Sequence, residues 1–78
     1  MRTTIKITTI KEIQTFVRKA SAIKGDIDLI QGKYRVPATS LMSVFALDLD
    51  KPVKIEFDDR IKEVVFNEFD EFILGDKE

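Results

Sequence analysis

Four short segments of this chain alternate apolar and polar residues, which is the pattern of a half-buried β-strand. The clearest is Val53–Phe57, where Lys54 and Glu56 separate three apolar residues. The other three segments span residues 3–8, 26–30 and 33–36. Because successive side chains of a strand point to opposite faces, each segment can cover a core on one side only. The pattern predicts a sheet with one buried face.

The first predicted helix spans residues 10–24, where apolar residues recur at helical spacing. Thr9 and Glu12 stand at the two positions of a capping box, in which each side chain accepts a hydrogen bond from the other residue's backbone. Lys24 and Gly25 favour the end of the helix, because a cation and a glycine suit its last turn.

Two further helices are predicted. Ser40 is a good N-cap for a short helix over residues 40–47. Asp58 and Asp59 can cap a last amphipathic helix, which should end near Gly75.

The order of elements is β-α-β-β-α-β-α, with no repeats or linkers, so residues 1–78 form one α+β domain. Packing the helices on one face of a four-stranded antiparallel sheet buries all the apolar stripes in two layers. Pro37 cannot donate to a ladder, so its strand should lie at a sheet edge. The predicted core consists of Ile5, Ile7, Ile13, Val17, Ala20, Ile27, Leu29, Val44, Leu47, Val53, Ile55, Val65 and Phe69, whereas Tyr34 and several phenylalanines should be partly exposed.

The chain contains neither cysteine nor histidine. Disulfides, thiolate zinc sites, imidazole ligands and histidine-based acid–base or phosphoryl chemistry are therefore excluded. The amino-terminal sequence lacks the apolar core of a secretory signal, and no apolar run approaches the roughly 18 residues that span a bilayer. We expect a cytoplasmic protein with no membrane partner and no cofactor.

Charge separates along the chain, because residues 1–24 carry six Lys or Arg against one Glu, whereas residues 48–78 carry eleven Asp or Glu against five Lys or Arg. Two solvated helix faces explain this separation best. Nucleic-acid binding is not expected, since the net charge is −1 and no aromatics interleave the basic residues. The acidic residues of the last helix are too spread around it to predict a metal site; they are Glu63, Glu68, Asp70 and Glu71.

Ser40 and the apolar residues that follow it allow two interpretations. Ser40 can serve only as a helix cap, or it can also be phosphorylated, since a helix start favours an anion. Leu41, Met42 and Phe45 can belong to the core, or they can form a contact surface. The second interpretation is favoured because Val44 and its neighbours 46 and 47 already supply an inward face for so short a helix.

The sequence of residues 38–47, Ala-Thr-Ser-Leu-Met-Ser-Val-Phe-Ala-Leu, resembles a segment of HPr, the phosphocarrier of the bacterial sugar phosphotransferase system. The family usually has Ala-Lys-Ser-Ile-Met-Gly-Val-Met-Ser-Leu there. Residues 19–29 are similar to the end of the family's first helix and its second strand, and residues 32–33 to its hairpin turn. The resemblance implies the HPr fold, an open-faced two-layer sandwich.

The same alignment places Thr9 where the family has its phosphohistidine, Lys11 where it has an arginine and Glu12 where it has a proline. Threonine lacks a ring nitrogen that could accept and return a high-energy phosphoryl group. Thr9 and Lys11 could still hold an anion at the helix start, but an ordinary capping box is favoured. A second departure lies near residues 58–60, where the chain looks a few residues shorter than the family.

By resemblance, Ser40 matches the serine that an ATP-dependent kinase phosphorylates in many Gram-positive bacteria. Leu41, Met42 and Phe45 match residues with which the family docks its protein partners. We therefore predict a non-enzymatic regulatory or adaptor module that binds phosphotransferase or carbon-control proteins. The alternatives are a kinase substrate switched at Ser40, like the catabolite-repression relatives of HPr, and a scaffold domain unrelated to sugar transport.

Overall fold

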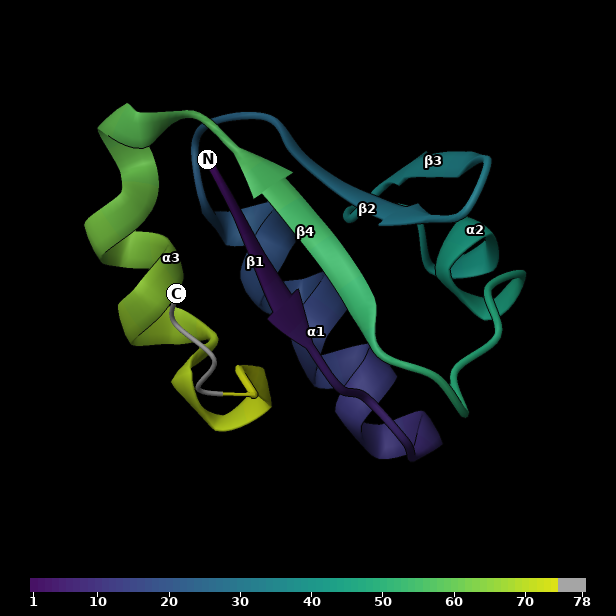
Figure 1. The fold of residues 1–78 in the computed structure, drawn as a ribbon. Coiled ribbons are helices and arrows are strands. Elements are labelled where there is room, and N and C mark those ends of the chain that lie inside the picture. The colour runs from purple at the N-terminus through teal and green to yellow at the C-terminus, as the bar shows by residue number, and fades with distance from the viewer. Residues whose placement is uncertain (75–78) are drawn as a thin grey trace.

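The computed structural model describes residues 1–74, which fold as four strands and three α-helices with two short 3₁₀ helices (Figure 1). In chain order the elements are β1 (Arg2–Ile5), α1 (Ile10–Ala22), β2 (Ile27–Gln31), β3 (Tyr34–Pro37), α2 (Leu41–Phe45), β4 (Val53–Phe57), η1 (Asp59–Ile61), α3 (Lys62–Glu68) and η2 (Asp70–Phe72).

The strands form one antiparallel sheet in the order β1-β4-β2-β3. β3 lies at one edge, as Pro37 predicted. The backbone N–H of Ala38 donates to the carbonyl of Ile27 at 2.8 Å. Because backbone groups alternate in direction along a strand, the nitrogen of Pro37 faces away from β2, where a missing donor costs no ladder hydrogen bond.

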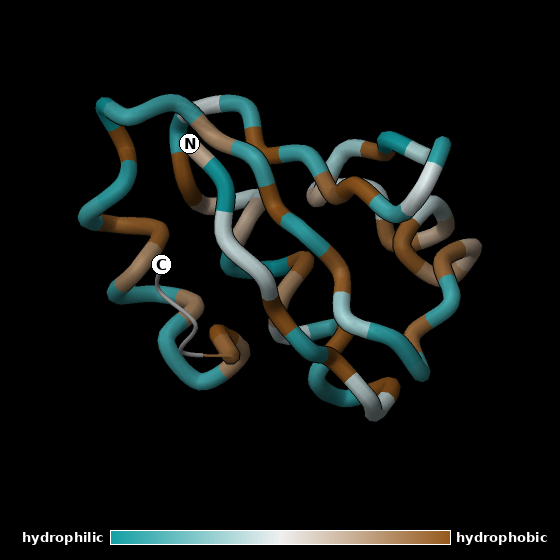
Figure 2. Tube along the Cα trace, in the orientation of Figure 1, coloured by the Kyte–Doolittle hydropathy of each residue, from teal (hydrophilic) through white to brown (hydrophobic). Residues whose placement is uncertain are grey.

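The core lies between the sheet and the helices, and the hydropathy of β4 alternates along the strand as predicted (Figure 2). Every predicted core residue is buried except Val17, which is only partly buried and packs against the core. Aromatic residues fill more of the core than predicted: the rings of Phe16 and Phe69 have centroids 4.6 Å apart, and Phe72 meets Phe16 edge-on at 5.8 Å. Tyr34, at 68% exposure, lies outside the core as expected.

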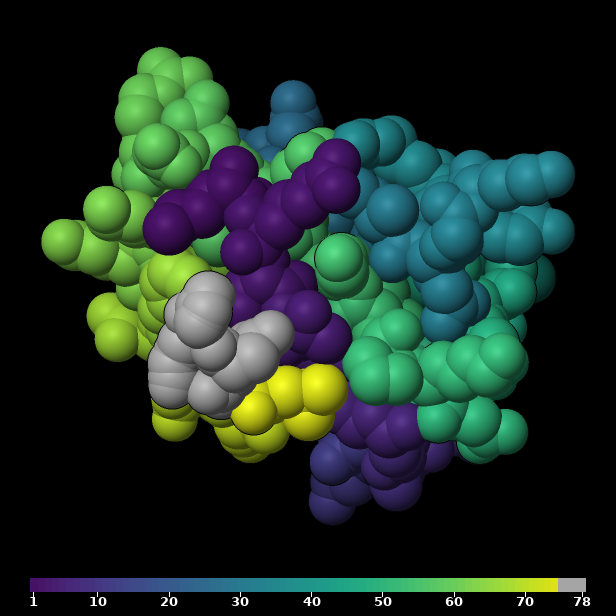
Figure 3. Space-filling view, viewed as in Figure 1, coloured from purple at the N-terminus to yellow at the C-terminus, as the bar shows by residue number. Residues whose placement is uncertain are grey.

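The other face of the sheet carries an ionic ladder that crosses all four strands, and Figure 3 looks onto this side of the molecule. Arg35 of β3 lies 2.7 Å from the carboxylate of Asp28 in β2 and 2.6 Å from that of Glu56 in β4. Arg2 of β1 reaches the same Glu56 carboxylate at 2.9 Å. Opposite charges on neighbouring strands stabilise this solvated face.

Several predicted boundaries are wrong by a few residues. The first strand ends at Ile5 rather than at residue 8, although Ile7 is still buried. The first helix ends at Ala22, because Ile23 has an extended backbone and serves as its C-cap. The hairpin strands are displaced by one residue, and α2 is shorter than its predicted span, since the chain leaves helical geometry after residue 46.

The predicted continuous last helix is also wrong: α3 ends at Glu68, and η2 follows after a break at Phe69. The predicted end at Gly75 lies outside the described residues. The break lets the chain return to the free edge of β1, where the N–H of Lys6 donates to the carbonyl of Phe72 at 2.9 Å and that of Leu74 to Thr4 at 3.1 Å. The backbone hydrogen bonds gained at this edge of the sheet therefore outweigh the helical preference that the spacing of apolar residues indicates.

Candidate functional site

Thr9 caps α1 through the predicted capping box, which the structure confirms. The hydroxyl oxygen of Thr9 accepts a hydrogen bond from the backbone N–H of Glu12 at 3.1 Å. The Glu12 carboxylate in turn accepts from the backbone N–H of Thr8 at 2.9 Å and from that of Thr9 at 3.3 Å. The chain's own carboxylate therefore supplies the negative charge that a helix start favours.

The hydrogen bonds from Thr8 and Thr9 lower the pKa of the Glu12 carboxyl, because they stabilise its charged form. Lys11 is exposed in the first turn of α1. Because the chain has no histidine, this helix start presents a threonine hydroxyl and a glutamate carboxylate bound to two backbone N–H groups, and no imidazole nitrogen.

Ser40 caps α2, as expected from the sequence. Its hydroxyl oxygen accepts from the backbone N–H of Ser43 at 3.4 Å and its hydroxyl group donates to the Ser43 oxygen at 3.0 Å. Ser40 is partly buried. A phosphate on the Ser40 oxygen would replace the hydrogen bond between the two hydroxyls with a charged group beside Ser43.

The apolar residues of α2 divide between core and surface. Val44 is fully buried, and Leu41 is partly buried and packs against the core cluster. Met42 is 81% exposed and Phe45 43% exposed. Of the three residues predicted to dock a partner, Met42 presents most of its side chain to solvent and Phe45 less than half, whereas Leu41 packs against the core.

Ile10 is an exposed apolar residue that the sequence interpretation missed. It is 64% exposed in the first turn of α1, and α1 packs against α2. The helical spacing of the apolar residues grouped Ile10 with those that face the core. On a helix of 3.6 residues per turn, Ile10 lies about 60° around the axis from Ile13 and about 120° from Phe16, so it falls at the margin of the stripe that these two residues bury. The exposed apolar residues of these two packed helices, Ile10 on α1 and Met42 and Phe45 on α2, are together called the α1–α2 apolar patch below.

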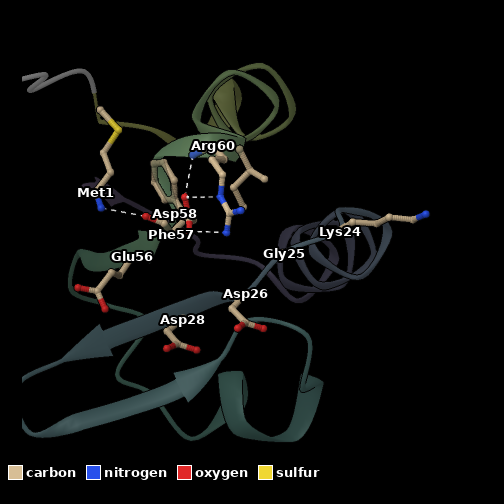
Figure 4. A pocket seen from close by; sticks show the side chains of 10 residues that line it. Met1, Lys24, Gly25, Asp26, Asp28, Glu56, Phe57, Asp58 and Arg60 are labelled. Carbon is tan, nitrogen blue, oxygen red and sulfur yellow. Dashed lines mark hydrogen bonds and ion pairs between the residues drawn. The ribbon is translucent and has the colours of Figure 1, made fainter.

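A hollow of about 710 Å³ lies at the opposite end of α1, beyond Lys24 and Gly25 (Figure 4). Asp58 lines it and accepts from the backbone N–H and the guanidinium of Arg60, which lowers the pKa of Asp58 and raises that of Arg60. A 13-residue helix is about 20 Å long. This hollow is therefore remote from Thr9 and belongs to a different region of the molecule.

The acidic residues of the last helix do not form a metal site within residues 1–74, where no group of three or more acidic side chains could hold a metal ion. Two of them instead contact α1: the Nζ of Lys19 donates to the backbone carbonyl of Glu68 at 2.9 Å and lies 3.4 Å from the carboxylate of Glu71. No helix among the described residues is both long and apolar enough to cross a membrane.

The sheet order and the three helices define the class of protein: an α+β open-faced sandwich with the HPr fold. A solved structure described as HPr-C-His from Thermoanaerobacter tengcongensis matches this chain with a TM-score of 0.76. The match covers 91% of this chain and 88% of that chain at 20% sequence identity. At this identity the likeness establishes the fold alone.

No protein-family model matches the chain, and no curated protein matches it in sequence.

Proposed function

We propose that this protein is a regulatory or adaptor module related to the phosphotransferase system, which binds protein partners through the α1–α2 apolar patch and carries no phosphoryl group. The observation that supports the proposal best is the exposure of Met42 and Phe45. Val44 of the same short helix is fully buried and already anchors it to the core. Exposed flexible and aromatic side chains of this kind are typical of contact surfaces.

The second support is the chemistry of the neighbouring helix start. Thr9 has no ring nitrogen, and the Glu12 carboxylate accepts from the N–H groups of residues 8 and 9. A partner that docks here would meet no histidine nitrogen that could accept a phosphoryl group. Such a protein would occupy a docking site without passing the phosphoryl group on, so it would compete with a histidine-bearing HPr.

A phosphotransfer assay tests both parts of the proposal. Labelled phosphoenolpyruvate, enzyme I and a histidine-bearing HPr are mixed with increasing amounts of this protein. We expect no label on this protein and a slower labelling of HPr. Label on this protein would refute the loss of carrier chemistry, and unchanged HPr labelling at a large excess would refute docking to enzyme I and favour a scaffold role outside sugar transport.

Matched variants locate the contact. Met42→Asp with Phe45→Asp should abolish the competition, because two charges would lie within the apolar contact. Val64→Asp is the control, since Val64 is also an exposed apolar residue but lies on α3. Equal loss of competition in both proteins would contradict a contact through α2.

The second candidate function is that of a kinase substrate switched at Ser40. It is favoured by the position of Ser40 at the start of α2, beside the exposed Met42. Incubation with HPr kinase and labelled ATP should label the wild type and Ser43→Ala but not Ser40→Ala. The absence of label on the wild type would refute this function, and label retained in Ser40→Ala would place the modification elsewhere.

A further inference from the structure

We draw no further inference here: the strongest candidate, the hollow of about 710 Å³ at the C-terminal end of α1, rests on a cluster of acidic side chains, of which Asp28, Glu56 and Asp58 pair with arginines of this chain, and nothing else among the described residues points to a ligand there.

Discussion

The Oε1 atom of Glu12 lies 2.9 Å from the backbone nitrogen of Thr8, so the N-terminal end of α1 is closed by a carboxylate of its own first turn. The same oxygen is 3.3 Å from the nitrogen of Thr9. Because these hydrogen bonds exist only in the folded chain, the charged form of Glu12 stabilises the folded state.

Glu12→Gln should lower the melting temperature at neutral pH, and the difference from the wild type should shrink in acid. The folded pKa of Glu12 is lowered, so its contribution is complete above the ordinary value of about 4.5 and is lost as the pH falls through the folded pKa. Thermal unfolding followed by circular dichroism between pH 7 and pH 3 measures this. A melting-temperature difference that stays constant or grows in acid would show that the charge of Glu12 does not stabilise the folded state.

Thr9→Ala should cost about 1 kcal/mol of unfolding free energy, because it removes the side chain that accepts from the N–H of Glu12. Thr9→Ser keeps that acceptor and is the matched control. Urea unfolding of the two variants gives the comparison. Equal stability of the two variants would mean that the cap contributes nothing.

The capping box was predictable because it depends on two residues three positions apart and on nothing else in the fold. The alternation of Val53–Phe57 was equally local, and one side of it is buried as expected. The break at Phe69 was not predictable, since no glycine or proline marks it and the apolar spacing continues across it to Phe72 and Ile73. Its cause is the distant edge of β1, which residues 72–74 cover.

The candidate site was partly predictable for the same reason. The role of Ser40 as a cap follows from its local sequence. The division of α2 into a buried Val44, a partly buried Leu41 and an exposed Met42 depends on where this five-residue helix meets the core. The exposure of Ile10 depends likewise on the orientation of α1 against the sheet, which sequence spacing does not determine.

Phe69→Ala should destabilise the protein far more than Phe45→Ala. Phe69 is fully buried and its ring packs on Phe16, so its truncation should cost about 3–5 kcal/mol. Phe45→Ala removes a partly exposed side chain and should cost less than about 1.5 kcal/mol. Chemical denaturation distinguishes them, and a large loss in Phe45→Ala would assign Phe45 to the core rather than to a docking surface.

Phe72→Ala should accelerate hydrogen exchange at the amide of Lys6, which donates to the carbonyl of Phe72. Phe72 anchors the last segment to β1, because its side chain is buried against Phe16. Leu74→Ala is the control, since the Leu74 side chain is half exposed and its backbone N–H is retained. Unchanged exchange at Lys6 in Phe72→Ala would contradict the anchoring role of Phe72.

Glu56 should titrate below the ordinary range of a glutamate, because hydrogen bonds from Arg2 and Arg35 lower the pKa of its carboxyl. Carbon NMR of the side-chain carboxyl against pH measures the midpoint. Arg35→Gln should raise that midpoint, whereas Lys62→Gln, on α3, should leave it unchanged. A midpoint that does not respond to Arg35→Gln would mean that the ladder across the sheet is not formed in solution.

Binding of a protein partner of the phosphotransferase type to the α1–α2 apolar patch is the part of the proposed function on which the rest depends. Titration of ¹⁵N-labelled protein with unlabelled enzyme I, followed by amide chemical shifts, tests it most directly. We expect the largest shift changes at Ile10, Lys11 and residues 40–46, and their loss in the double variant of Met42 and Phe45 to aspartate. Changes centred on α3 or on the open face of the sheet, or no changes at a large excess of enzyme I, would contradict the claim.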